Sequence, residues 1–145
     1  MSEIELNMAT IDDAPAIAHI LTDPLVRQRA HLLVIPDPAA VTMLMASVHL
    51  LAIRRAGRVV GIITLDRVSE KCWELGYLLS RSDWGHGIMT TAVGLLLERL
   101  RLGTQLTATV DNGNVASQRV LVKNGFVRVG DDGERGTWRY KKDLR

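Results

Sequence analysis

Two glycines separated by one histidine stand directly before a long apolar stretch, and this spacing is suited to holding a phosphate. The turn follows an apolar strand over residues 73–79, and a helix pattern begins at Ile88. Glycines leave backbone N–H groups unobstructed, and the helix dipole adds positive potential at its start. No Lys-Ser or Lys-Thr pair follows Gly87, and no third glycine follows three residues later, which excludes the loop of nucleotide hydrolases and the dinucleotide fingerprint.

A second pattern lies further along the chain, over residues 107–126. It reads as an alternating strand, a polar turn and a short helix. Asn114 is a favourable N-cap for that helix, and Gly125 stands where a left-handed C-terminal cap is expected.

Together the two segments resemble the signatures of the GNAT superfamily of N-acetyltransferases, whose members bind acetyl-coenzyme A at a Q/R-x-x-G-x-G/A loop that opens a helix. Gly85 and Gly87 match the two small positions, whereas Ser82 stands where the family has Gln or Arg. Asn114 begins a helix that ends in Lys-Asn-Gly-Phe, which is similar to the second signature. Trp84 before the first glycine looks most like the ribosomal-protein N-terminal (RimJ/RimL-type) branch. The resemblance covers almost the full chain.

This resemblance implies a site for acetyl-coenzyme A. The pyrophosphate would lie on the N–H groups of residues 83–88, and the pantetheine arm would pair with the strand before them like an added strand. Asn114 either caps its helix, contacts that arm, or does both, and His86 either faces a phosphate or is a solvated loop residue. The implied donor-site residues are Tyr77, Leu78, Leu79, Asp83, Trp84, Gly85, His86, Gly87, Ile88, Asn114 and Ser117.

The resemblance also implies positions for catalytic groups. Glu74 is the candidate general base, acting through a water, although it also fits an ordinary solvent-facing strand residue. Many family members have, four residues before the Gly-Phe pair, a tyrosine that protonates the departing thiolate. This chain has Leu121 at that position. Ser117, one turn earlier on the same face, is the candidate replacement, and its alternative role is a hydrogen bond to a helix carbonyl. A thiol of pKa about 8.5 also leaves tolerably well without protonation.

Amine chemistry favours an α-amine as the acceptor. At pH 7 an α-amine of pKa about 7.8 is roughly 10–15% neutral, whereas a lysine amine of pKa about 10.4 is roughly 0.04% neutral. We therefore expect a protein or peptide N-terminus as acceptor. The alternatives are a small-molecule amine, such as a polyamine, amino acid or antibiotic, and a non-catalytic coenzyme A-binding module.

Composition limits the other possibilities. A chain of 145 residues suits one domain over residues 1–145, and a net charge of +2 gives little reason to expect nucleic acid. A single cysteine, Cys72, allows no internal disulfide and fits a cytoplasmic setting. No signal peptide or membrane span is expected, and the four histidines lack metal-ligand spacing, so no metal is expected either. A homodimer is compatible with the sequence.

The pattern of elements predicts an α/β fold of GNAT type, a mixed and mainly antiparallel sheet of six to seven strands with helices on both faces. The segment between residues 22 and 47, where the family usually shapes the acceptor pocket, is unassigned over 25–35. Helices are expected from the capping box at Thr10 to the break at Asp23-Pro24, and over 37–47, 88–101 and 114–124; strands are expected over 3–9, 49–54, 58–66, 73–79, from 107, 126–129 and 136–142.

Overall fold

A computed structural model describes residues 3–30, 36–130 and 136–145. Within them, seven strands form one sheet in the order β1-β2-β3-β4-β5-β7-β6. The β4–β5 pair is parallel, and the other neighbouring pairs are antiparallel, which confirms the predicted mixed sheet. The strands are β1 (Ile4–Met8), β2 (His49–Arg55), β3 (Arg58–Arg67), β4 (Cys72–Leu79), β5 (Gln105–Asp111), β6 (Val127–Gly130) and β7 (Thr137–Asp143).

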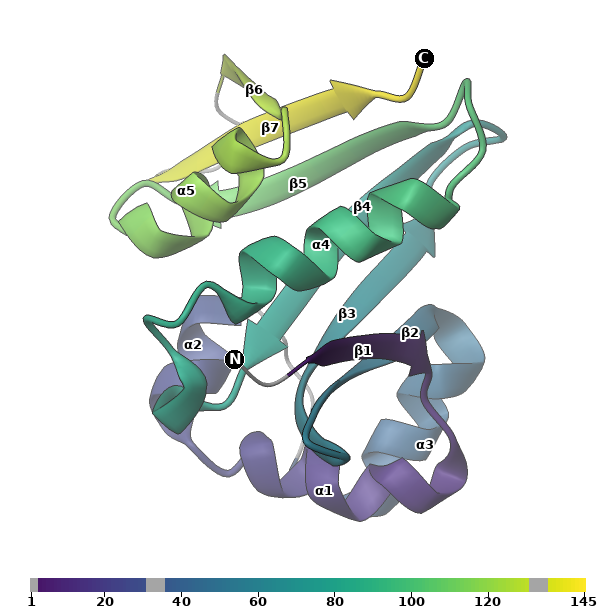
Figure 1. Cartoon of the computed structure of the whole chain (residues 1–145), viewed down its shortest axis with the longest axis vertical. Coiled ribbons are helices and arrows are strands. Elements are labelled where there is room, and N and C mark those ends of the chain that lie inside the picture. Colours follow the sequence, from purple (N-terminus) through teal and green to yellow (C-terminus); the bar gives the residue numbers. More distant parts are fainter. Residues whose placement is uncertain (1–2, 31–35, 131–135) are drawn as a thin grey trace.

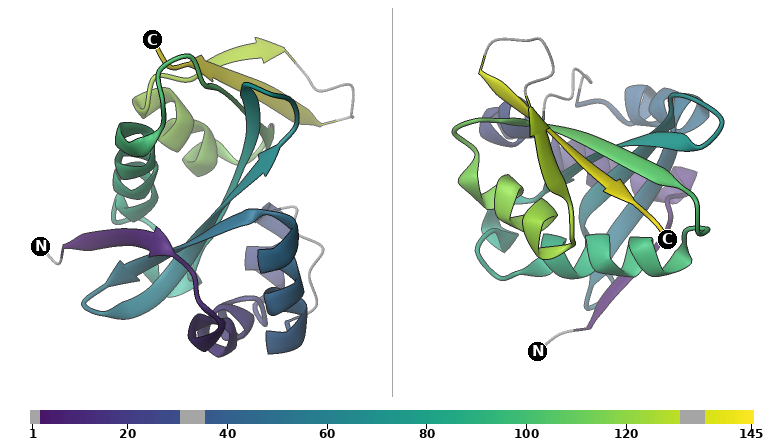
Figure 2. Two further views of the ribbon diagram at one scale, coloured as in Figure 1. Left: turned by 90° about the vertical axis from the view of Figure 1, so that its right-hand side faces the viewer. Right: turned by 90° about the horizontal axis from the view of Figure 1, so that it is seen from above.

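Helices cover both faces of this sheet (Figures 1 and 2). The helices α4 and α5 lie on one face, and α1, α2 and α3 lie on the other. Short 3-10 turns precede α1 and α4. In chain order the helical elements are η1 (Ile11–Asp13), α1 (Ala14–Ile20), α2 (Pro24–Ala30), α3 (Pro38–Ser47), η2 (Arg81–Asp83), α4 (Ile88–Arg99) and α5 (Val115–Lys123). None of these described helices is both long and apolar enough to span a membrane.

The two helical layers require strands that are buried on both faces, and β2 shows how the sequence provides this. Leu50 packs in the core beneath α1 and α3, whereas Leu51 and Ile53 pack in the core beneath α4. Successive side chains of a strand point to opposite faces. A nearly continuous apolar run therefore supplies two cores at once, each covered by its own helices.

The segment that the sequence left unassigned contains α2. Asp23-Pro24 breaks the preceding helix as expected, and it also starts the next one. The carboxylate of Asp23 accepts a hydrogen bond from the Leu25 N–H at 3.1 Å, and Pro24 occupies the first helical position, where its fixed φ is favourable. The rest of the unassigned segment, residues 31–35, lies outside the described residues.

The parallel pair β4–β5 is short and then separates. Only residues 72–74 of β4 pair with residues 105–107 of β5, although both strands continue for several residues (Figure 1). Beyond Glu74, β4 therefore has a free edge that faces β5 across a gap. The end of β4 lies beside the first turns of α4 and α5.

Candidate active site

A cavity of about 370 Å³ lies where the end of β4 meets α2 and the beginnings of α4 and α5. Every residue predicted for the donor site lines it, with the exception of His86. His86 is exposed, with Nδ1 3.3 Å from the Asp83 carbonyl oxygen. Ser82, at the Gln/Arg position of the family signature, is also exposed and contacts Ser80 through its hydroxyl at 3.2 Å. The roles of the individual donor-site residues remain predictions.

The glycine turn forms an open cradle at the start of α4. Gly85 and Gly87 have φ of +79° and +72°, a left-handed conformation that is readily available to glycine alone. A Cβ atom added at either position would meet no atom within 4 Å apart from its own chain neighbours. The first N–H groups of α4 have no partner within the helix. The cradle therefore fits a pyrophosphate in both shape and polarity.

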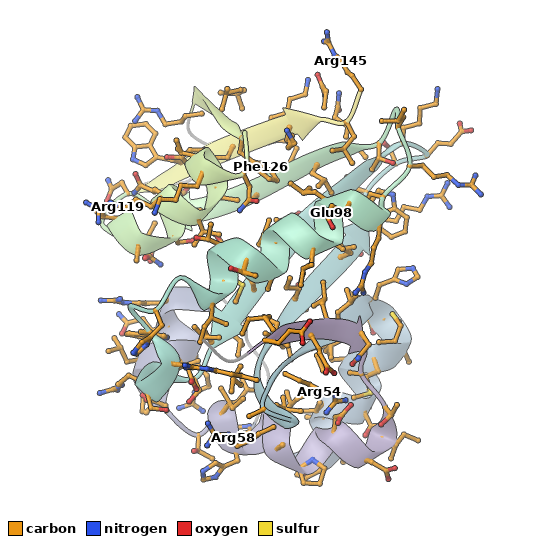
Figure 3. All side chains as sticks on the ribbon, viewed as in Figure 1. Arg54, Arg58, Glu98, Arg119, Phe126 and Arg145 are labelled. Carbon is orange, nitrogen blue, oxygen red and sulfur yellow. The ribbon has the colours of Figure 1, made fainter. Side chains whose placement is uncertain are left out.

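Positive charges surround the same cavity. Arg29 of α2 and Arg119 and Lys123 of α5 line it, and Figure 3 shows where Arg119 lies on α5. Of the described lining residues, Asp83 alone is acidic, and its carboxylate lies 3.7 Å from the guanidinium of Arg55. A cavity with this charge balance favours a polyanionic ligand.

The free edge of β4 supplies the backbone groups that a linear ligand needs. The Ser80 N–H donates to the Val60 carbonyl at 2.8 Å, so Ser80 points its backbone groups toward β3. Because backbone groups alternate along a strand, those of Tyr77 and Leu79 point away from β3, toward the gap. The Trp84 indole donates to the Leu79 carbonyl at 2.8 Å, which fixes the end of this edge.

Two hydroxyl groups meet at the cavity wall. The oxygens of Tyr77 and Ser117 lie 2.7 Å apart, and the Tyr77 hydroxyl also lies 3.0 Å from the Ser117 carbonyl oxygen. Asn114 caps α5, since its side-chain oxygen accepts from the Ser117 N–H at 3.2 Å. Burial raises the pKa of Tyr77 to about 12, although its hydrogen bond with Ser117 acts in the opposite direction. Tyr77 is therefore a protonated donor at neutral pH. Leu121, in contrast, is fully buried in the core.

Glu74 lies beside this arrangement rather than in it. It is exposed on β4, opposite Asp66 of β3 and Thr107 of β5. A smaller cavity of about 30 Å³ adjoins the site and is lined by Gly76 and Thr109, among others. Gly76 is the next residue of β4 on the Glu74 face, about 7 Å along the strand. A bridging water is therefore compatible with the geometry, and the role of Glu74 as the base remains a prediction.

Sequence reasoning missed the basic residues that line the cavity, namely Arg29, Arg119 and Lys123. Two of them lie on α5, and a spacing of three and four residues places them on one face of that helix with Ala116 and Val120, which also line the cavity. That periodicity was a usable signal. Arg29 had no comparable signal, because α2 itself was unassigned. In the described part of the chain, His, Cys, Asp and Glu side chains form no group of three or more that could hold a metal ion.

Comparisons with known proteins agree with this geometry. The family model described as an acetyltransferase (GNAT) domain matches residues 3–127. A search of curated proteins found no significant match. Solved structures of similar fold include a ribosomal-protein α-N-acetyltransferase (RimL) in complex with coenzyme A, at 17% identity and a TM-score of 0.77, with 99% of this chain and 96% of that chain covered.

Two further solved structures of similar fold are a spermidine and an aminoglycoside acetyltransferase. Spermidine N-acetyltransferase from Vibrio cholerae, in complex with coenzyme A and spermine, has a TM-score of 0.81 at 14% identity, over 97% of this chain and 95% of that one. An aminoglycoside acetyltransferase in complex with coenzyme A has a TM-score of 0.79 at 16% identity, over 97% and 95%. At these identities the likeness concerns the fold.

Proposed function

The chain belongs to the GNAT acetyltransferase family, and from this premise we propose that it transfers the acetyl group of acetyl-coenzyme A to the α-amine of a protein or peptide, as RimJ/RimL-type enzymes do. The observation that carries the proposal is one continuous cavity in which the glycine cradle of α4 and the free edge of β4 are both present. A phosphate site and an unpaired strand edge together match a ligand with a pyrophosphate and an amide-containing arm.

In this proposal the residues around the cavity bind the donor and stabilise the oxyanion that forms during transfer. The thioester of acetyl-coenzyme A supplies the activated acetyl group. The cradle holds the pyrophosphate, and Arg119 and Lys123 balance its charge. The backbone groups of Tyr77 and Leu79 that face the gap pair with the arm. An N–H of that edge is positioned to stabilise the oxyanion that forms during transfer.

We assign the role of general base to Glu74, as the sequence predicts, and it accepts the amine proton through a water. The Ser117 hydroxyl, which the sequence offered as the acid, lines both cavities, although the thiolate also leaves tolerably well without protonation. A site with an exposed carboxylate as its base favours an α-amine over a lysine amine by roughly 3 kcal/mol, because less deprotonation is required.

A small-molecule amine is the second candidate, because spermidine and aminoglycoside acetyltransferases share this fold. The charges of the site weigh against a polycation. The smaller cavity, at the gap through which the acceptor would approach, has Arg29 and no acidic side chain among its described lining residues. An acceptor with several amines would therefore meet few carboxylates.

Calorimetric titration with acetyl-coenzyme A, in wild type and in Gly85→Glu, tests the donor site. We expect micromolar binding that the variant loses, because a carboxylate would occupy the cradle. Matched peptides, one with a free α-amine and one with a blocked N-terminus and a free lysine, then test the acceptor by release of the thiol. Faster acetylation of the lysine peptide would contradict an α-amine as the acceptor. If acetyl-coenzyme A does not bind, the proposed acetyl transfer is wrong.

A further inference from the structure

We propose that the Tyr77 hydroxyl donates a hydrogen bond to the sulfur of the donor as the C–S bond breaks, and that Ser117 is the positioning residue that holds this hydroxyl. The inference rests on the proposed function, since it presupposes a thioester in the cavity. It assigns contact with the leaving group to β4, whereas the sequence pointed to α5 alone.

The position of Tyr77 relative to the two cavities supports this assignment. Tyr77 and Ser117 line both the larger and the smaller cavity, whereas Gly85 and Gly87 line only the larger one. The shared residues therefore mark the junction of the cavities. If the phosphates occupy the glycine end, the reactive end of the donor extends toward this junction, where an acceptor can approach through the gap between β4 and β5.

The contacts of the hydroxyl allow it to reorient without losing its support. The Tyr77 O–H can donate to the Ser117 carbonyl oxygen at 3.0 Å, while the Ser117 O–H donates to the Tyr77 oxygen at 2.7 Å. When the Tyr77 O–H turns toward a bound sulfur, the hydrogen bond from Ser117 remains. Asn114 in turn fixes the first turn of α5 that carries Ser117.

The acidity of Tyr77 defines what it does in the reaction. With a pKa raised to about 12 by burial, its hydroxyl is a weaker acid than a thiol of pKa about 8.5. It therefore stabilises the thiolate by a hydrogen bond and keeps its proton. The new C–N bond forms and the electron pair of the C–S bond goes to sulfur. The nitrogen releases its proton through a bridging water to the Glu74 carboxylate, and the thiolate takes a proton from solvent water.

The thiol pKa of bound coenzyme A tests this role without any acceptor. A donor at the sulfur favours the thiolate, so the thiol of the complex should titrate at a lower pH than free coenzyme A, as followed by ultraviolet absorbance of the thiolate. We expect Tyr77→Phe to raise that pKa by about one unit, which is a ten-fold loss of thiolate at a fixed pH below it. Ser117→Ala should give a smaller shift in the same direction.

Tyr140→Phe is the matched control. Tyr140 is a buried tyrosine whose hydroxyl contacts Gln118 at 3.3 Å, and it does not line either cavity. An unchanged thiol pKa in Tyr77→Phe, with coenzyme A still bound, would overturn the inference and leave the proposed function intact. A shift in Ser117→Ala alone would identify Ser117 as the donor and also overturn it. Failure of the wild type to bind coenzyme A would exclude both proposals.

Discussion

The guanidinium of Arg29 lies 4.8 Å from the centre of the Trp84 ring, so that a positive charge from α2 stands over the turn that leads into the glycine cradle. Arg29 lines both cavities, and the indole beneath it is fixed by its hydrogen bond to the Leu79 carbonyl. This cation–π contact ties α2, the end of β4 and the cradle together on one side of the site.

The first prediction follows from this contact. Arg29→Gln should weaken coenzyme A binding about five-fold at low salt, because it removes one positive charge from the cavity. The difference from wild type should shrink as salt screens the charge. Titration calorimetry at two salt concentrations measures it. Arg27→Gln, on the same helix but outside the cavity lining, serves as the control, and an equal loss in that variant would show that overall charge is responsible.

The second prediction separates backbone strain from ligand binding. Gly87→Ala should lower the free energy of unfolding by about 1 kcal/mol, because a φ of +72° is unfavourable for alanine. It should also weaken coenzyme A binding, because its methyl group would lie in the cradle. Gly57→Ala is the matched control, since Gly57 has φ of +76° and equally open surroundings in the β2–β3 turn. It should lose similar stability in thermal unfolding and bind the ligand normally. Equal binding by both variants would contradict a phosphate cradle.

The order of the elements could be predicted from the sequence because local signals marked most boundaries. The Thr10 capping box, Pro38 after Asp37, the Asn114 cap and the glycine turn all lie where the structure uses them. Each of these signals depends only on a residue and its neighbours within a few positions. The helix α2 lacked a clear apolar periodicity, with Val26 as its one buried residue, so the same reasoning could not find it.

The local features of the site could be predicted from the sequence, but its long-range contacts could not. The glycine turn is a local feature, so its position and its left-handed backbone could be predicted from the residues themselves, whereas its role as a phosphate site remains a prediction. The contact between Tyr77 and Ser117 joins residues 40 positions apart, and it lies beyond the point where β4 and β5 stop pairing. The alternating pattern of either strand does not encode the residue at which β4 and β5 stop pairing.

The third prediction concerns acid stability and the residue pair Asp13 and Arg54. The Asp13 carboxylate accepts hydrogen bonds from the Thr10 N–H at 2.9 Å and from Arg54 at 2.7 Å. Burial by itself would raise the pKa of Asp13, but these hydrogen bonds and the charge of Arg54 outweigh it and hold the pKa below its usual value. The carboxylate therefore stabilises the fold above the unfolded pKa of about 3.9, and this contribution is lost as the pH falls through the lower native value.

Asp13→Asn should accordingly be about 1–2 kcal/mol less stable than wild type at neutral pH. The gap should narrow as the pH is lowered below about 4, because wild type loses its carboxylate there. Chemical denaturation over a pH series measures the gap. Asp12→Asn, an exposed neighbour, should change stability little at any pH. A gap for Asp13→Asn that stays constant down to strongly acidic pH would show that the charge of Asp13 does not contribute.

The fourth prediction tests Glu74 as the base. Glu74→Gln should lower kcat/KM for an α-amine acceptor about a hundred-fold at neutral pH, since general base catalysis contributes at least this much. The variant should bind coenzyme A with unchanged affinity, because Glu74 does not line the donor cavity. The deficit should shrink as the pH rises toward the acceptor pKa of about 8, where more of the amine is already neutral. Asp66→Asn removes the exposed carboxylate directly across the strand pair and should retain activity. Similar losses in the two variants, or a Glu74→Gln deficit that does not change with pH, would mean that the local negative charge matters and that Glu74 does not accept the proton.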